Sequence, residues 1–312
     1  MIPNQYWQIG LSTHTGPVKK RNEDFYFIKQ FEENGTTEFT MVAIADGMGG
    51  YDRGDAASQK AVSMLEEWWG NHLQRVLKKN HPLKNIMKEM KILLQKINKN
   101  LLQFEGKSGT TLSILVLYKG NYAVSHVGDS RIYQIKAGGV GFQNYFRSKQ
   151  KSQVEEVLRL QNTEALDIEG EIIQLTDDHS WVGQEVKKGR LTKEEARNHK
   201  KRNVLTQCLG IKKDVMSWEQ MGSYQSSDLF LLCSDGFYSM FSNEEITETL
   251  CGLEKEYTDL QTMADYLVKL ANYSGTRDNI TVLLLRNIFE KDEISEKKSS
   301  FFSFLKLNRG VN

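Results

Sequence analysis

The order of strand-like and helix-like segments is the strongest constraint on the fold of this chain. Short β-branched or aromatic runs come in groups, amphipathic segments come in pairs, and no strand–helix–strand alternation extends along the sequence. A doubly wound parallel sheet needs that alternation, whereas an antiparallel core does not. The pattern therefore predicts an α+β fold in which a two-layer antiparallel core has helices packed outside it.

The expected elements can be placed by residue number. Short apolar runs bounded by turn residues predict strands, and apolar side chains three to four residues apart predict helices. The expected strands are 6–13, 25–29, 39–45, 111–118, 122–127, 131–136, 229–233 and 281–286, with a hairpin turn at 119–121. The expected helices are 55–73, 83–104, 154–160, 181–188, 193–199, 243–250 and 260–273.

Composition excludes several classes of protein. The 41 basic and 40 acidic residues leave a net charge of +1, which argues against a nucleic-acid-binding protein. No stretch approaches the roughly 18 to 20 apolar residues that span a bilayer, and the first residues do not resemble a secretory signal. Cys208, Cys233 and Cys251 are too far apart for a zinc knuckle or a disulfide framework. We therefore expect a cytoplasmic protein with reduced thiols.

Acidic residues stand in tight turns where expected strands end. Asp46 directly follows the apolar run MVAIA, and Asp235 follows LFLLC after one serine. Each is followed by a glycine, which lets the backbone turn sharply and brings a carbonyl close to whatever the carboxylate binds. Mg²⁺ and Mn²⁺ prefer carboxylate and carbonyl oxygens. An isolated Asp-Gly pair is an ordinary turn, so these residues alone leave both a turn and a divalent-ion site open.

Six strings in the sequence resemble, in order and spacing, the bacterial branch of the type 2C (PPM-type) metal-dependent protein phosphatases. They are DGMGG at 46–50, VGDSR at 127–131, LTDDHSWV at 175–182, GRLTKEEARNHKKRNVLTQCLG at 189–210, CSDGFY at 233–238 and RDNIT at 277–281. Each string is weak alone, but six in order are specific. The resemblance implies one phosphatase domain over residues 1–289, built as a central antiparallel β-sandwich with helices on both faces in four αββα layers.

The resemblance also implies the reaction and the residues that perform it. The enzyme would hydrolyse phosphoserine and phosphothreonine in proteins by metal-activated water, without a covalent intermediate. Asp46, Asp235 and Asp278 would be the catalytic ligands of two Mg²⁺ or Mn²⁺ ions. The other implied ligands are the Gly47 carbonyl, Glu23 through a metal-bound water, and Asp129 for a third ion. The side chains implied to support these ligands are Asp24 and Asn279, with Thr110 and Thr111 beneath the site.

Two positions depart from the pattern of the family or of part of it. Lys19 stands where the family has an arginine that binds the substrate phosphate, and Arg21 lies nearby. Lysine supplies charge but not the planar pair of donors that arginine offers. The residue that binds phosphate is therefore Lys19, Arg21 or neither of them. Met48 stands where eukaryotic relatives have a histidine proposed as general acid, as in other bacterial members. His126 and His179 are candidate substitutes, although we expect structural roles for both.

Three further expectations concern segments and partners. Residues 178–192 match a flap beside the metal site, and residues 137–170 form an insertion that decorates the surface or contacts a partner. Residues 290–312 are expected to be a flexible tail, with contact to a membrane or a partner as the alternative. The resemblance implies phosphorylated proteins as substrates and a serine/threonine kinase as partner. A catalytically weak relative that binds phosphoproteins or acts as a scaffold is the alternative function.

Overall fold

The structure is a computed structural model that describes residues 5–33, 36–49, 53–104, 106, 108–136 and 171–289. The expectations for the insertion at 137–170, including its helix at 154–160, lie outside the described residues. The expectation of a tail at 290–312 lies outside them as well.

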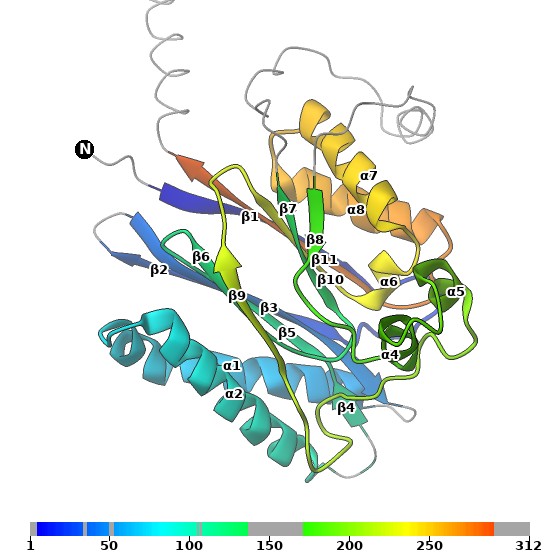
Figure 1. The fold of residues 1–312 in the computed structure, drawn as a ribbon, viewed down its shortest axis with the longest axis horizontal. Helices are drawn as coiled ribbons and strands as arrows, with labels where there is room; N and C mark the ends of the chain where they lie inside the picture. The colour runs from blue at the N-terminus through cyan, green and yellow to red at the C-terminus, as the bar shows by residue number, and fades with distance from the viewer. Residues whose placement is uncertain are drawn as a thin grey trace, which may run out of the picture.

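Two antiparallel sheets face each other at the centre of the molecule (Figure 1). The first sheet has the strand order β1-β11-β10-β7-β8, and the second has the order β2-β3-β5-β6-β9, with β4 paired to β3. The strands of the first sheet are β1 (Gln5–His14), β11 (Ile280–Phe289), β10 (Leu229–Cys233), β7 (Arg131–Lys136) and β8 (Glu171–Gln174). Those of the second are β2 (Asp24–Glu33), β3 (Thr36–Gly49), β5 (Leu112–Tyr118), β6 (Asn121–Val127), β9 (Trp218–Ser223) and β4 (Ser108–Thr110).

Helices cover the outer face of each sheet. The helices α7 (Asn243–Glu256) and α8 (Leu260–Tyr273) lie on the first sheet, and α1 (Gly54–Leu77) and α2 (Pro82–Leu101) lie on the second (Figure 1). Three short helices stand at one end of the sandwich: α4 (Trp181–Lys187), α5 (Lys193–Asn198) and α6 (Asp235–Tyr238). The four αββα layers expected from the family resemblance are therefore confirmed. No helix in the described part of the chain is long and apolar enough to cross a membrane.

The continuous apolar runs follow from this layering, because each central strand is buried on both faces. On β5, Leu115 and Leu117 point into the space between the sheets, while Ile114 and Val116 pack with α1 and α2. Aromatic rings add to the core between the sheets. Phe230 has its ring centre 6.1 Å from that of Trp7, with the two rings tilted relative to each other. Burial of this kind contributes roughly 1.5–3 kcal/mol for each large apolar side chain.

The sequence predicted most elements but missed three strands. The hairpin at 119–121 is confirmed: β5 and β6 pair antiparallel, and Lys119 and Gly120 both have positive φ angles, of 47° and 74°. The missed strands are β4, β8 and β9, which are short or polar. The last of these, WEQMGS, lies at the edge of its sheet and is partly or fully exposed along its length, so it lacks the apolar alternation that predicts a strand.

The close approach of α8 to β1 makes a testable demand on Gly10. A Cβ atom there would lie 2.0 Å from the carbonyl oxygen of Leu260. We expect Gly10→Ala to lower the free energy of unfolding by about 1–3 kcal/mol, because the helix must move away from the sheet. Gly70 on α1 is the matched control, since nothing lies within 4 Å of its added Cβ. Gly70→Ala should raise stability by about 0.5–1 kcal/mol. Urea denaturation measures both, and equal midpoints for the two variants would contradict this packing.

Candidate metal centre

The ends of several strands bring carboxylates together at one end of the sandwich. Asp24 opens β2 and lies opposite Asp46 on β3 in the strand register. Asp129 lies in the turn between β6 and β7, and Asp235 is the first residue of α6, just after β10. Asp278 precedes β11. The acidic residues that the sequence indicated therefore come from both sheets and converge. Asp46 lies within β3, which continues to Gly49 by pairing with β4, and not in the turn that the sequence predicted.

The backbone around Asp46 is fixed by two threonines. The Asp46 N–H donates to Thr111 Oγ1 at 2.9 Å, and the Asp46 carbonyl accepts from the Thr111 N–H at 2.9 Å. Thr110 Oγ1 donates to the same carbonyl at 3.0 Å. These three hydrogen bonds fix the strand end that presents the Asp46 carboxylate. Both threonines therefore contact the backbone of Asp46 directly.

Gly47 occupies a position with no room for a side chain. A Cβ atom there would lie 2.3 Å from the Gly54 carbonyl oxygen and 2.6 Å from the Glu23 carbonyl oxygen. Glu23 in turn reaches across to Gly54, where a Cβ would lie 2.5 Å from Glu23 Oε1. Two glycines thus allow the start of α1, the end of β3 and the Glu23 side chain to crowd together.

Asp24 links the two sheets. It begins a strand of the second sheet, and its Oδ2 accepts from Ser234 Oγ at 2.9 Å and from Thr281 Oγ1 at 2.6 Å. Ser234 and Thr281 belong to the strand ends of the first sheet. The carboxylate is therefore held in place by hydroxyl groups of the other sheet.

Asn279 joins Asp278 to the loop that carries Lys19 and Glu23. Its N–H donates to Asp278 Oδ1 at 2.8 Å, and its Oδ1 accepts from the Glu23 N–H at 2.9 Å. Its Nδ2 donates to the carbonyls of Thr15 and Arg21 at 2.7 and 2.9 Å. Asn279 thereby links two expected metal ligands: its backbone N–H contacts Asp278 and its side-chain oxygen contacts the Glu23 N–H.

Burial and mutual repulsion raise the pKa values of these acids. Burial is the largest cause throughout. The pKa of Asp24 is raised to about 6, and that of Asp129 to about 7, where Asp178 adds to the effect of burial. Burial and the neighbouring aspartates raise the pKa of Asp46 and of Asp235 well above the usual range. Asp46 and Asp235 keep part of their surface open to solvent, whereas Asp24 and Asp129 are buried.

The arrangement suits a hard divalent cation. Asp24 Oδ1 and Asp235 Oδ1 are buried and have no hydrogen-bond partner, and unpaired buried carboxylate oxygens are costly. The donor set consists of carboxylate and carbonyl oxygens, which Mg²⁺ and Mn²⁺ prefer. Within the described ranges, no three His, Cys, Asp or Glu side chains are already arranged around one point as ligands. The acids are therefore close neighbours rather than a closed ligand shell.

Lys19 lies inside this acidic cluster, and Arg21 lies at its rim. Lys19 Nζ is 2.7 Å from Asp278 Oδ1. Burial disfavours the charged lysine, but the ion pair with Asp278 and the nearby Glu23 outweigh that effect, and the pKa of Lys19 is raised. Arg21 is two-thirds exposed and lies 3.7 Å from Asp55. Of the two candidates for binding phosphate, Lys19 is thus the one beside the expected metal ligands.

The two candidate histidines support the turn that presents Asp129. His126 is buried between Ser113 Oγ at 2.7 Å and the Gly128 carbonyl at 2.9 Å, and burial lowers its pKa to about 3. His179 Nδ1 accepts from the Gly128 N–H at 3.2 Å, and burial lowers its pKa as well. A general acid must carry a proton near the working pH, so this geometry favours the structural role for both histidines.

Arg131 and Tyr238 are functional candidates that the sequence did not single out. The Arg131 guanidinium binds both oxygens of Asp178, with its shortest contact at 2.7 Å, and lies 3.7 Å from the centre of the Tyr238 ring. Asp178 opens the expected flap, and the adjacent His179 N–H donates to the Gly128 carbonyl at 2.7 Å. The base of the segment 178–192 is thus tied to the Asp129 turn. The only signal in the sequence for this role was Arg131 itself, a charged residue at the end of VGDSR and at the start of an apolar strand.

Comparison with known proteins identifies similar chains. The family model described as "Protein phosphatase 2C" matches residues 18–278. The serine/threonine phosphatase stp of Listeria welshimeri is 30% identical over 286 residues, which cover 89% of this chain and 96% of the relative. A structure of the S. agalactiae serine/threonine phosphatase matches with a TM-score of 0.68 at 28% identity, covering 90% of this chain and 99% of that one.

A further similar structure is that of the catalytic domain of the serine threonine protein phosphatase PstP in complex with 2 manganese ions. It matches with a TM-score of 0.66, covering 91% of this chain and 100% of that one. At 23% identity, this likeness supports the shared fold.

The raised pKa values predict how the metal-free protein responds to pH. In the folded state the pKa of Asp24 is about 6 and that of Asp129 about 7, against an ordinary aspartate pKa of 3.8. The folded protein therefore binds more protons than the unfolded chain between about pH 4 and 7, and its free energy of unfolding falls as pH rises through that window. In EDTA, the urea midpoint should be higher at pH 5 than at pH 8.

The variant Asp129→Asn tests the origin of that slope, because an amide does not titrate. We expect a weaker pH dependence than in the unmodified protein, while Asp214→Asn, at an exposed position, should keep the full dependence. Identical pH profiles for Asp129→Asn and the unmodified protein would contradict this assignment.

Proposed function

This chain belongs to the protein phosphatase 2C family, and on that premise we propose that it hydrolyses phosphoserine and phosphothreonine in proteins with the help of divalent metal ions. The observation that carries the proposal is the converging set of carboxylates centred on Asp46. Four further aspartates stand close enough to Asp46 to help raise its pKa. Gathering like charges in this way lowers the stability of the fold, so such a cluster indicates a functional site.

The residues that would hold the ions are those implied by the sequence. Asp46 and the Gly47 carbonyl would bind one ion, and Asp46, Asp235 and Asp278 would bind a second. The PstP structure with two manganese ions supports this number. Glu23 would hold an ion through water, and Asp129 with Asp235 would hold a third. When bound, such ions supply a nucleophilic hydroxide at neutral pH and offset the charge on the phosphoryl oxygens.

The chain's own side chains would orient and confine the reaction. Asn279 would keep Asp278 and Glu23 in place, and Asp24 would tie the second sheet to Ser234 and Thr281 of the first. Lys19 would contact the substrate phosphate as a point charge, because its ammonium group lies among the metal ligands. The segment 178–192 would act as a flap, with its base anchored by the Arg131–Asp178 ion pair.

The substrates and partners follow from the chemistry of the reaction. A phosphatase of this class acts on proteins that a serine/threonine kinase has phosphorylated, so we propose such a kinase as the enzyme that supplies its substrates. The alternative function is that of a catalytically inactive relative that binds phosphoproteins. Such a protein would be expected to have lost at least one of the metal-ligating residues. This chain retains Asp46, Asp235 and Asp278.

Hydrolysis of p-nitrophenyl phosphate tests the proposed activity. We expect a rate that requires Mn²⁺ or Mg²⁺ and that EDTA abolishes. Asp235→Asn should reduce kcat by on the order of 10²-fold or more, because the variant removes a ligand charge. Asp214→Asn is the matched control and should retain the full rate. Equal rates for the two variants would exclude Asp235 as a ligand, and metal-independent hydrolysis would overturn the mechanism.

Lys19 and Arg21 can be separated by substrate affinity. If Lys19 contacts the phosphate, Lys19→Ala should raise KM for a phosphopeptide by about tenfold, which corresponds to one charge-assisted contact. Arg21→Ala should leave KM within about twofold, because Arg21 is exposed and turned towards Asp55. An unchanged KM in Lys19→Ala would show that Lys19 does not contact the phosphate. A KM that is raised only in Arg21→Ala would show that Arg21 makes this contact instead.

A further inference from the structure

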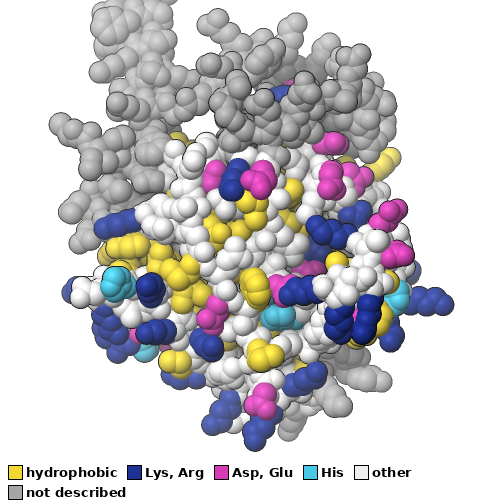
Figure 2. Space-filling view, viewed as in Figure 1, with side chains coloured by type: hydrophobic (Ala, Val, Ile, Leu, Met, Phe, Trp, Pro, Cys, Tyr) yellow, Lys and Arg dark blue, Asp and Glu magenta, His cyan; other side chains and the backbone are white. Residues whose placement is uncertain are grey.

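The outer face of α2 is a row of lysines. Every exposed residue of this helix is a lysine except Ile92 and Gln95. The lysines are Lys84, Lys88, Lys91, Lys96 and Lys99. Lys and Arg side chains gather over this layer at the lower left of the space-filling view (Figure 2). Since the whole chain has a net charge of only +1, this row is a local concentration of charge.

Among the described residues, most of these lysines have no partner of opposite charge. The single acid of α2, Glu89, accepts from Trp68 Nε1 at 2.9 Å and lies 3.5 Å from Arg75 and 3.8 Å from Lys79. Lys91 lies 3.8 Å from Glu219. In the described part of the chain, no carboxylate lies within 4.0 Å of the ammonium groups of Lys84, Lys88, Lys96 or Lys99. Like charges at this spacing repel one another, so the face suits an anionic partner.

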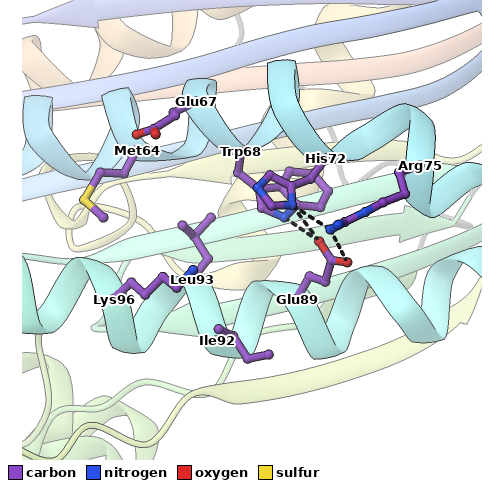
Figure 3. Close-up of a pocket in the computed structure, with 9 residues that line it drawn as sticks. All are labelled: Met64, Glu67, Trp68, His72, Arg75, Glu89, Ile92, Leu93 and Lys96. Carbon is purple, nitrogen blue, oxygen red and sulfur yellow. Dashed lines mark hydrogen bonds and ion pairs between the residues drawn. The ribbon is translucent and has the colours of Figure 1, made fainter.

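A cavity of about 370 Å³ opens beside the lysine row, between α1 and α2 (Figure 3). Trp68 lies at its base with 5% of its surface exposed, and His72 stacks on the indole ring at an interplanar angle of 5°. Leu93 adds apolar surface, and Ile92 stands at the rim with 56% of its surface exposed. Charged and polar side chains line the rest of the cavity, namely Glu67, His72, Arg75, Glu89 and Lys96, and Glu89 is already paired with Arg75 and Trp68. The cavity thus has an apolar part formed by Met64, Trp68, Ile92 and Leu93, with room for one large side chain.

Helix geometry joins the cavity to the lysine row. Residues three and four apart lie on the same face of a helix, so Ile92 neighbours Lys88 and Lys96. Lys96 also lines the cavity. The row from Lys84 to Lys99 extends about 22 Å along the helix axis. A ligand of that length could place an apolar group in the cavity and negative charges along the row at once.

We propose that the α1–α2 face binds an acidic, amphipathic peptide segment of a protein partner. One apolar side chain of that segment would occupy the cavity over Trp68, and its carboxylates would lie along the lysines of α2. Helices with one apolar face bind grooves between helices in this way, and charge complementarity sets the orientation and the association rate. The surface shares no residue with the metal centre and is independent of the proposed function.

The shape of the surface favours a peptide over other anionic partners. A bilayer surface binds proteins that project apolar side chains outwards, and among the residues of α2 only Ile92 does so. A lipid surface would also leave the cavity unfilled. Single-stranded nucleic acid binds through stacking on exposed aromatic rings, whereas Trp68 is buried and already stacked against His72.

Binding of a labelled peptide tests the proposal on the full chain. The probe is a fluorescein-labelled helical peptide of about 15 residues with glutamates on one face and a single central leucine. Two companion peptides replace the glutamates by glutamine or the leucine by serine. Fluorescence polarisation gives Kd, and the indole N–H resonance of Trp68 reports whether the cavity is occupied. Hydrolysis of p-nitrophenyl phosphate shows that each variant is folded and active.

The decisive variant is Lys84→Glu combined with Lys88→Glu. We expect it to weaken binding at least tenfold, because two attractive contacts become repulsive, and Ile92→Ser should weaken binding severalfold. The matched control, Lys255→Glu with Lys269→Glu, makes the same change in net charge on α7 and α8 and should alter Kd by less than twofold. All variants should retain phosphatase activity, so the result is separate from that of the proposed function.

Several outcomes would overturn the proposal. Absence of peptide binding would do so, as would equal loss of binding in the control variant, which would show only long-range attraction. Equal binding of the glutamine peptide would exclude charge recognition. Co-sedimentation with phosphatidylglycerol vesicles that Lys84→Glu with Lys88→Glu abolishes, without peptide binding, would assign the face to a membrane surface instead.

Discussion

Repulsion among carboxylates held at one end of the sandwich is the constraint on which the rest of this structure depends. Burial disfavours the charged form of each acid, and the neighbouring acids disfavour it further. Asp46 is affected most clearly, since four other aspartates contribute to its raised pKa. A fold that gathers such groups must derive its stability elsewhere. Here that stability comes from two sheets whose central strands are buried on both faces.

The site lies on the seam between the sheets, which explains how the acids are kept in position. Asp24 belongs to the second sheet, yet the hydroxyls that hold it come from Ser234 and Thr281 at strand ends of the first. Asp235 and Asp278 approach from the first sheet and Asp46 from the second. Any cation shared by these residues would therefore bind the two halves of the core together. Metal binding and the stability of the sandwich are thus physically coupled.

The parts of the fold that could be predicted are those set by local pattern. Apolar runs such as LFLLC of β10 are strands because both of their faces are buried, and this is visible in the residues themselves. The polar edge strand β9 could not be predicted in that way. Strand order was also hidden, because β1 pairs with β11 from the other end of the chain, with Gln5 opposite Phe289. Such pairing is decided by tertiary packing rather than by local sequence.

The same distinction applies to the site. The ordered strings identified the acidic turns, since a string preserves residue type and spacing. The strings could not reveal that Lys19 pairs with Asp278 or that Arg131 stacks on Tyr238, because those contacts depend on where separate loops meet. Arg131 on β7, Asp178 at the start of the segment 178–192 and Tyr238 on α6 come from three parts of the chain that only folding brings together.

Electrostatics would also couple the proposed binding of substrate to the proposed binding of metal ions. A phosphorylated side chain carries a charge of about −1.5 to −2 at neutral pH, and it would have to approach the carboxylates around Asp46. Lys19 is a single positive charge within that cluster and is already paired with Asp278. One lysine cannot offset both the acids and the phosphate. The acids that would repel the substrate are the ones that would bind cations, so bound cations would make the site more attractive to phosphate.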